Sequence, residues 1–440
     1  MEDKNTFKDW SVKLVAATQE IGSDKPIDLD TIYDDNLILA GKAAGICYMS
    51  DTYLSEGIQN KDAALKRANN CLKSGHTSVF EHGHVAFMIR CSKIVAMILN
   101  STNLYNTSEK SARYTKMEAA TNIEKELYDK WNEIFLKLII AYDVASGTQA
   151  EKLAMENARY MLSIDTMTTM EYTVPFGRAL LLPYMFINTD FIFGEYSLAQ
   201  KIKEELNFIG NEIYRELKVP EELKEELEKY KACIHDSVSL GANFNNKNIK
   251  LDFFGKFKED KDLVFNTIDD AEEYYGDLYT SIYEASFAEI AQAQRHRTLK
   301  YSVEIVNDNT GDFKCYVPNI IKNSPYEEVW INDFKSLLRN GIYPQCTLLR
   351  VKETGRFEEF VLKCKERLCT RAQYEIFDIT RQQVKKFIIN KHNLSSYNIY
   401  KLDKMTDSNS CFGVCYRCSF KDFTCKEPCK ISKEINYRNV

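Results

Sequence analysis

The stretch AQAQRHRTLKYS, residues 291–302, places an Arg-His-Arg triplet after a segment that reads as a helix. The stretch SEKSARY, residues 108–114, carries Ser-x-Arg-Tyr in a polar setting. No Ser-x-Arg-Tyr follows the triplet in the first stretch, and no Arg-His-Arg precedes the second. The two stretches look like two parts of one signature, set apart along the chain and in reversed order.

Length and composition predict a globular protein of two compact domains. The chain has 440 residues, of which 44% are hydrophobic and 28% are charged, as is ordinary for such proteins. The net charge of −6 argues against broad nucleic-acid binding, because that depends on many Lys and Arg side chains neutralising phosphates. We therefore expect no nucleic-acid partner, although a local basic pocket for one small phosphate ester remains open.

Targeting features are not evident in the sequence. The first ten residues, MEDKNTFKDW, are acidic and polar where a signal peptide has a basic start and an apolar run. The richest apolar run, residues 176–187, is shorter than the ~18 residues a spanning helix needs and contains Arg and Pro. We expect a cytoplasmic protein without a membrane partner, whose cysteines stay reduced.

Apolar residues at helical spacing predict four helices in the first half of the chain, and alternation at 84–90 predicts a strand. The strongly charged segment 219–231 reads as a connecting helix. We place a first domain at 1–218, a second at 232–400 and a Cys-rich tail at 401–440. The predicted first-half helices are 61–74, 122–145, 150–163 and 196–217.

The second half contains two strand candidates and two helix candidates. The strands are expected at 248–257 and 313–318, and the helices at 268–296 and 356–387. On the last helix, Arg367 would lie four residues before another arginine, in a pattern that also suits an exposed, ion-paired helix face. The alternative is a single Arg aimed at a pyrimidine carbonyl, where it stabilises charge as a nucleophile attacks the ring.

The densest polar stretch is GHTSVFEHGHVAF, residues 75–87, which holds His76, Ser78 and Glu81 with two further histidines. It lies between a predicted helix end and a predicted strand, where backbone and side chains can converge on a ligand. Three interpretations remain open: a cofactor or substrate site, a capping and core-polar role, and a metal site. The spacing of these side chains matches no standard zinc pattern.

Two basic segments suit anionic ligands. In SEKSARY, Ser111 and Arg113 combine a neutral donor with a bidentate cation, which can hold a phosphate. In the second stretch, Gln292 and Arg295 share a helix face by spacing, while His296 points aside. Together with Arg297, this segment suits a dianionic ligand or the anionic states of a flavin. The alternative is a basic helix end stabilised by the helix dipole.

Taken jointly, these stretches resemble the flavin-dependent thymidylate synthase family. That family carries His-x-Ser-x-Phe-Glu-His, Gln-x-x-Arg-His-Arg leading into Ser-x-Arg-Tyr, and a later Arg before Ala-Gln-x-Glu-Ile. Residues 156–183 and 343–360 resemble a further region of the family, once in each half. The motif positions matched are His76, Ser78, Phe80, Glu81, His82, Ser111, Arg113, Tyr114, Gln292, Arg295, His296, Arg297, Arg367, Ala372, Gln373, Glu375 and Ile376.

Each half also departs from the family pattern. The first half has Ser101, Thr102 and Asn103 where Arg-His-Arg would stand. The second half has Asn307 and Asp308 where Arg-Tyr would stand, and it lacks the His-x-Ser-x-Phe-Glu-His motif. The resemblance therefore covers most of the chain from 30 to 400 as two diverged copies.

The resemblance implies an α+β fold of two tandem thymidylate synthase-like domains, with helices packed on a mostly antiparallel sheet. It implies FAD-dependent reductive methylation of dUMP to dTMP, with methylenetetrahydrofolate and NADPH as co-substrates. The implied catalytic residues are Arg367 and Arg297, and the implied cofactor-binding residues are His76, Ser78, Glu81, Arg295 and His296. The implied substrate-binding residues are Gln292, Arg297, Ser111, Arg113 and Arg367.

The resemblance also suggests why the signature is divided. The family is a homotetramer whose active sites use several subunits, so a fused duplicate can lose a different part from each copy. We expect composite sites from both halves and a homodimer that forms a pseudo-tetramer. A related deoxyuridylate-modifying enzyme, for example a hydroxymethylating one, and a degenerate nucleotide- or flavin-binding non-enzyme remain alternatives.

The Cys-rich tail contains a Cys-x-x-Cys pair followed by two further cysteines. Four thiolates at short range allow a tetrahedral zinc site, formed by Cys415, Cys418, Cys425 and Cys429. An iron–sulfur cluster and free or disulfide-bonded thiols are the alternatives.

Overall fold

The computed structural model contains two compact units, which are built from interleaved parts of the chain. The first unit comprises residues 1–110 and 167–252, and the second comprises 111–166 and 253–440. The structure describes residues 10–21, 26–48, 55–74, 76–102, 105–112, 115–187, 196–224, 263–266, 278–306, 313–391, 394, 396–406, 414–421 and 440.

The first unit is built on a four-stranded antiparallel sheet with strand order β1-β2-β4-β3. The predicted strand at 84–90 is confirmed as part of β2, whose Val85, Phe87 and Ile89 are buried. The strands are β1 (Ser11–Ala17), β2 (His84–Ser92), β3 (Asn106–Glu109) and β4 (Met167–Pro175).

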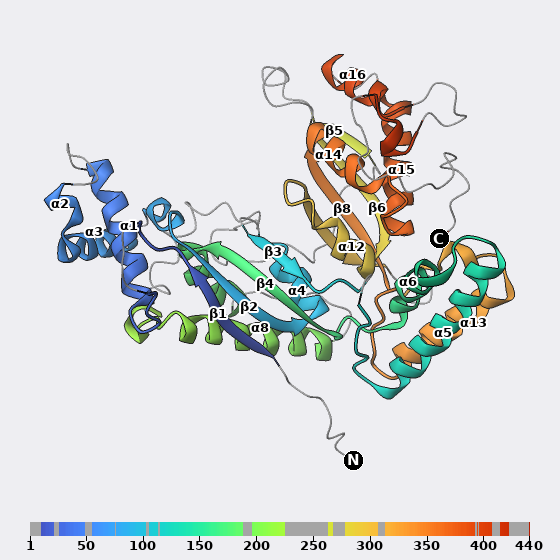
Figure 1. The fold of residues 1–440 in the computed structure, drawn as a ribbon, viewed down its shortest axis with the longest axis horizontal. Helices are drawn as coiled ribbons and strands as arrows, with labels where there is room; N and C mark the ends of the chain where they lie inside the picture. Colours follow the sequence, from blue (N-terminus) through green and yellow to red (C-terminus); the bar gives the residue numbers. More distant parts are fainter. Residues whose placement is uncertain are drawn as a thin grey trace. The chain divides into compact units, whose positions relative to one another are not determined.

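Helices accompany this sheet, and α8 runs along it (Figure 1). The predicted helices at 61–74 and 196–217 are confirmed. The Asn60 side chain caps α3 by accepting a hydrogen bond from Ala63 N. The helices of this unit are α1 (Ile32–Tyr48), α2 (Glu56–Gln59), α3 (Lys61–Lys73), η1 (Thr77–Glu81), α4 (Lys93–Leu99), α7 (Phe176–Ile187) and α8 (Tyr196–Glu216).

The second unit contains another four-stranded antiparallel sheet, with strand order β5-β6-β8-β7. Its strands are β5 (Leu263–Asn266), β6 (Leu278–Ser286), β7 (Lys300–Ile305) and β8 (Leu348–Arg356). Its helices are α5 (Asn122–Ala141), α6 (Gly147–Ala158), η2 (Arg159–Met161), α12 (Phe287–Ala293), η4 (Asn319–Ile321), α13 (Pro325–Arg339), α14 (Phe357–Arg367), α15 (Tyr374–Ile389), α16 (Ser396–Lys404) and η6 (Arg417–Ser419).

The two sheets repeat one architecture. In each, the second and fourth strands in chain order pair along nine residues without a register shift, from His84↔Pro175 to Ser92↔Met167 and from Leu278↔Arg356 to Ser286↔Leu348. In each, the serine that ends the inner strand caps the next helix.

A glutamate on a later helix accepts a hydrogen bond from the backbone N–H of this serine in both units. The bond joins Ser92 to Glu205 at 2.6 Å in the first unit and Ser286 to Glu375 at 2.8 Å in the second. The repeat therefore extends from strand order to individual contacts, and the α+β fold with antiparallel sheets agrees with the sequence prediction.

The helical segment 111–166 packs within the second unit. Trp131 of α5 meets Trp330 of α13 edge to face, with ring centroids 4.7 Å apart, and both side chains are fully buried. The Trp131 indole N–H also donates to Asp333 at 2.8 Å. This packing differs from the boundaries predicted from sequence, which assigned 1–218 to one domain, because the apolar face of α5 is covered by a helix of the second half.

Three second-half predictions were wrong. The segment predicted as a helix at 268–296 contains strand β6 before the short helix α12. The segment 356–387 is two helices, since α14 ends at Arg367 and α15 begins at Tyr374. The segment expected as a strand at 313–318 contains isolated bridge residues instead, among them Cys315, which pairs with Thr347. Residues 225–231 and the strand expected at 248–257 lie outside the described residues.

Among the helices of the described ranges, none combines the length and apolar character that crossing a bilayer requires.

Candidate active site

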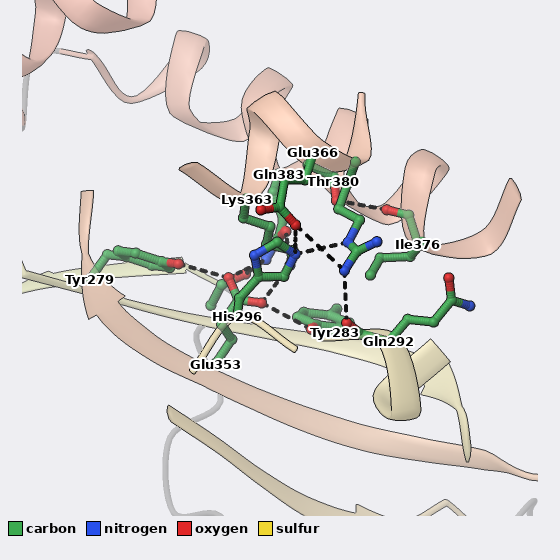
Figure 2. A network of polar contacts seen from close by, with 12 residues as sticks. Tyr279, Tyr283, Gln292, His296, Glu353, Lys363, Glu366, Ile376, Thr380 and Gln383 are labelled. Carbon is green, nitrogen blue, oxygen red and sulfur yellow. Dashed lines mark hydrogen bonds and ion pairs between the residues drawn. The ribbon is translucent and has the colours of Figure 1, made fainter. Parts of the chain in front are cut away.

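A short hydrogen bond joins the ends of two helices in the second unit. Arg367, the last residue of α14, donates from Nε to His296 Nε2 at 2.8 Å and from Nη2 to the carbonyl oxygen of Gln292 at 3.2 Å (Figure 2). Burial, followed by the charges of Arg367 and Lys363, lowers the pKa of His296 to about 2. The imidazole is therefore neutral and acts as an acceptor beside a fixed cation.

The orientation predicted for the Arg-His-Arg triplet was wrong. His296 is buried, whereas Arg295 and Arg297 are exposed. Helix α12 already ends at Ala293, and the backbone N–H of His296 bonds to the Ala293 carbonyl in a tight turn. Helical spacing no longer applies beyond that point, so the imidazole faces inward and the two guanidinium groups face outward.

Side chains from both sequence halves meet next to this pair. Gln373 accepts hydrogen bonds at Oε1 from Gln292 Nε2 and, at 2.7 Å, from Arg159 Nη2. Its Nε2 donates to the Tyr160 hydroxyl at 2.5 Å. Arg159 and Tyr160 belong to η2, which precedes β4 in the first half, yet they lie in the same compact unit as Gln373.

Glu375 connects Tyr160 to Ser286, at the start of α12. Its carboxylate accepts from the Ser286 backbone N–H at 2.8 Å, from the Ser286 hydroxyl at 2.6 Å and from the Tyr160 hydroxyl at 2.6 Å. Burial raises the pKa of Glu375, and these hydrogen bonds oppose that shift. Gln373 and Glu375 are the Gln and Glu of Ala-Gln-x-Glu-Ile, and here they join helices instead of facing solvent.

Near His296 lies a buried polar network that sequence reasoning missed (Figure 2). The Lys363 ammonium donates to Glu353 at 2.6 Å and to Gln383 at 3.0 Å, and neither the Lys363 nor the Glu353 side chain is exposed. The Tyr279 and Tyr283 hydroxyls donate to Glu353 at 2.7 and 3.1 Å. The available signal was a glutamate at an inward position of β8, but β8 itself was not predicted.

Glu289 of α12 is a second buried acid in this region. It is fully buried, and neither carboxyl oxygen has a hydrogen-bond partner among the described residues. Burial raises its pKa to about 8, the charges of Glu375 and Glu353 act in the same direction, and those of Lys363 and Arg367 oppose it. At neutral pH this carboxyl is therefore mostly protonated.

The first-unit candidates lie on and around η1. His76 and Ser78 are exposed, and Glu81 is half-buried. The Arg178 guanidinium of α7 lies 3.6 Å from Glu81. Helix α7 approaches η1 closely at Gly177, where a Cβ would lie 2.9 Å from Phe80 Cβ.

Arg178 is only 4% exposed, and its Nε and Nη1 find no hydrogen-bond partner among the described residues. Burial lowers its pKa, and burial also raises the pKa of Glu81. A buried guanidinium with unsatisfied donors suits an anionic group such as a cofactor diphosphate. This arrangement fits FAD, and sequence reasoning noted Arg178 only as part of a resembling segment.

The remaining predicted residues are only partly described. Ser111 lies in the second unit, where its carbonyl accepts from Thr115 N at 3.1 Å, and Arg113 lies outside the described residues. Cys415 is half-buried and Cys418 is exposed.

Cys425 and Cys429 lie outside the described residues, so the zinc site stays a prediction. Within the described ranges, no three His, Cys, Asp or Glu side chains form a group that could hold a metal ion.

The comparison with solved structures finds similar proteins, but with low TM-scores and low sequence identity. The chain is similar to a UMP/dUMP methylase, PolB, from Streptomyces cacaoi bound with 5-Br dUMP, with 14% identity, 47% of this chain and 89% of that chain covered, and a TM-score of 0.30. It is similar to flavin-dependent thymidylate synthase ThyX from Helicobacter pylori complexed with FAD and dUMP, with 16% identity, 52% and 99% covered, and a TM-score of 0.27. At such scores these likenesses carry no argument.

Family comparison is more informative. No curated protein matches the chain in sequence. Residues 30–181 match the family of the thymidylate synthase complementing protein, Thy1. This range contains the His-x-Ser-x-Phe-Glu-His motif, Ser111 and Arg159. Over residues 30–181, about a third of its length, the chain is therefore similar to the Thy1 family.

Proposed function

We propose that the protein catalyses the FAD-dependent reductive methylation of dUMP to dTMP, with methylenetetrahydrofolate as the carbon donor and NADPH as the reductant. The match of residues 30–181 to the Thy1 family carries this proposal. It would act in the cytoplasm on small molecules.

The cluster around Arg367 supports an anionic nucleotide substrate. Arg367 is held by a neutral His296, so the positive charge of the pair is that of Arg367, at a site that is largely shielded from water. The more exposed Glu366 carboxylate lies 3.9 Å from Arg367 Nη2. A fixed cation of this kind stabilises negative charge that develops on a pyrimidine ring. Gln292 contacts Arg367 through its backbone carbonyl oxygen, and its side-chain amide lies beside Arg367.

Contacts between the sequence halves support composite sites. Arg159 and Tyr160, which lie in the family-matching segment, bond to Gln373 and Glu375 of the second half within one compact unit. The shared strand order and register support a duplication that placed two copies in one chain. A homodimer would then provide four copies, as in a tetramer of single domains.

The first unit would contribute to holding FAD. The unsatisfied donors of Arg178 favour an anionic group, and His76, Ser78 and Glu81 come from the motif segment next to it. In the second half, Arg295 and His296 are the residues that we propose for flavin binding. In the first half, Ser111 with Arg113 would hold the nucleotide phosphate. Bound FAD supplies the hydride for the reduction.

The direct test is mass spectrometry of the nucleotide after incubation of the purified protein with dUMP, methylenetetrahydrofolate, FAD and NADPH. We expect a product with the mass of dTMP. A hydroxymethylated product would replace the proposed reaction with the related one. Unchanged dUMP from a protein that still binds FAD or dUMP would refute both reactions and leave the non-enzymatic binding role.

The composite arrangement has its own test. We expect Arg113→Ala and Arg297→Ala, one from each half, to weaken dUMP binding separately. The two variants are then mixed, first as preformed dimers and then after dissociation and reassociation. Recovery of dUMP binding only after reassociation would show that residues of different chains act in one site. Unchanged dUMP affinity in both variants contradicts a site composed from both halves.

A further inference from the structure

The repeated architecture allows position-by-position comparison of the two interiors. Strands β2 and β6 align from their first residues, β4 and β8 likewise, and each inner strand ends on its capping serine. Helices α7 and α14 both begin with a phenylalanine directly after the strand. The glutamates that hold the capping serines, Glu205 and Glu375, align α8 with α15.

At six corresponding buried or half-buried positions, the side chains of the two units differ in polarity and charge. The first unit has five aliphatic side chains and one tyrosine, whereas the second has two tyrosines, two glutamates, a lysine and a glutamine. The corresponding pairs are Val85 and Tyr279, Ile89 and Tyr283, Val95 and Glu289, Tyr172 and Glu353, Leu182 and Lys363, and Ile213 and Gln383.

The same comparison locates the counterparts of the site residues. Thr102 occupies the position of His296, and its hydroxyl bonds to the Tyr172 hydroxyl at 2.6 Å. Phe186, which is fully buried, occupies the position of Arg367. The first unit therefore lacks both the Arg–His pair and the charged network near it, although its sheet and helices have the same plan.

The fold does not require the charged network, because the first unit forms the same fold with an apolar interior. Removing a lysine and a glutamate from water costs several kcal/mol per ion by general estimates, and apolar replacements of such pairs are often neutral or stabilising. Lys363 and Glu353 are both fully buried. A role outside stability is the remaining reason for them.

The network connects directly to the helix end that carries Arg367. Lys363 and Arg367 are four residues apart on α14 and share a face. The Lys363 ammonium anchors this face to Glu353 of β8 and Gln383 of α15, one turn before the helix ends. These bonds hold the rotation of α14 and its height above the sheet, so they hold the Arg367 guanidinium in its position.

We infer that Lys363 and Glu353 are positioning residues, which hold Arg367 in place for the nucleotide in the second unit. This inference rests on the proposed function, because it assigns Arg367 to the substrate. Gln383 supports Lys363 by accepting its second hydrogen bond and donating to Glu353 at 3.2 Å.

The test replaces both charges with neutral side chains of similar size in Glu353→Gln/Lys363→Met, so that neither partner is left as an unpaired ion. We expect a melting temperature close to that of the wild type. We expect dUMP affinity and kcat to fall on the order of ten-fold to a hundred-fold, as displaced catalytic groups do. The Kd for dUMP is measured by calorimetry and kcat by product mass.

A matched control removes another ion pair from the same helix. Glu358 of α14 pairs with Lys401 and is nine residues from Arg367, which places it on the opposite face. Glu358→Gln/Lys401→Met should leave dUMP affinity and kcat unchanged. Lys363→Arg, which keeps the buried cation, should recover part of the lost kcat relative to Lys363→Met.

The possible outcomes distinguish a failure of the positioning role from a failure of the proposed function. A folded Glu353→Gln/Lys363→Met variant with wild-type dUMP affinity and kcat would overturn the inference alone. Wild-type protein without dUMP affinity would overturn it together with the proposed function. If the double variant fails to fold, Gln383→Met decides, because it loosens Lys363 without removing a charge. A wild-type kcat in Gln383→Met would then count against positioning.

Discussion

Arg367 Nε donates a hydrogen bond to His296 Nε2 at 2.8 Å, so a permanent cation uses a neutral imidazole as its acceptor. Because Nε2 accepts, a neutral His296 carries its proton on Nδ1. Burial and the neighbouring Arg367 and Lys363 prevent a second proton from binding near neutral pH. This pair therefore contributes to the pH dependence of stability on the acid side.

For His296→Gln we expect a weaker dependence of stability on acid pH. The unfolded chain binds a proton at His296 below its ordinary pKa of 6.5, whereas the folded protein does so only near 2. Wild-type stability should therefore fall as pH decreases from about 6.5, by up to about 1.4 kcal/mol per unit. Urea denaturation between pH 4.5 and 7 measures both slopes. Equal slopes for variant and wild type would contradict a buried neutral imidazole.

Glu289→Gln should change the pH dependence in the opposite direction. The folded protein keeps the Glu289 proton up to about pH 8, whereas the unfolded chain releases it near 4.5. This group therefore reduces wild-type stability as pH rises through that window, by up to about 1.4 kcal/mol per unit. The variant cannot titrate, so its stability should fall less between pH 5 and 8. Glu284→Gln, an exposed neighbour, is the control and should behave as wild type.

Glu375→Gln and Glu205→Gln should have parallel effects in the two units. Each glutamate accepts from the backbone N–H of a helix-capping serine, and an amide in its place offers only one acceptor oxygen. Loss of a charge-assisted bond at a buried helix start should cost about 1–3 kcal/mol in each case. Denaturation followed by circular dichroism measures this. A loss confined to one variant would argue against equivalent roles.

Trp330→Ala should loosen the contact between α5 and α13. The indole is fully buried against Trp131, and truncating such a side chain typically costs about 3–5 kcal/mol. We expect faster proteolysis within residues 111–166, mapped by mass spectrometry of the fragments. Val329→Ala, at an exposed neighbouring position, is the matched control. An unchanged cleavage pattern in Trp330→Ala would show that α13 does not hold this segment.

Arg178→Met should weaken FAD binding. The buried guanidinium has donors without partners among the described residues, and an anionic cofactor group would satisfy them. We expect the Kd for FAD to rise on the order of ten-fold, measured by flavin fluorescence. Arg215→Met removes an exposed cation from the same unit and serves as control. Undiminished FAD affinity in Arg178→Met would exclude this guanidinium from the cofactor site.

Sequence patterns predicted the strands and helices whose hydrophobic residues recur at a regular spacing. They failed for elements whose structure depends on contacts with distant parts of the chain. Strand β2 was predictable because Val85, Phe87 and Ile89 alternate with less buried residues. Strand β6 was assigned to a helix, since Tyr279 and Tyr283 in an otherwise mixed segment satisfy either period. The Tyr279 and Tyr283 hydroxyls bond to Glu353 of β8, which is about seventy residues further along the chain. The local sequence pattern cannot indicate such contacts.

For the site, motifs identified the residues but not their orientation. The motifs selected Gln292, His296 and Arg367, which hydrogen bonds join in the structure, yet the inward direction of His296 depends on where α12 ends. Arg178 became a candidate only through its burial, and Lys363 only through its partners. A lysine in an amphipathic helix is ordinarily a surface residue, so its sequence position gives no reason to bury it.

The packing of α5 against α13 has a consequence for biosynthesis. The first half of the chain leaves the ribosome with α5 and α6 complete, but the covering residue Trp330 is synthesised only after the second sheet has begun. Until then the apolar face around Trp131 is uncovered, as in other chains whose long-range contacts form late. A fragment that ends before α13 would therefore leave the apolar face around Trp131 uncovered.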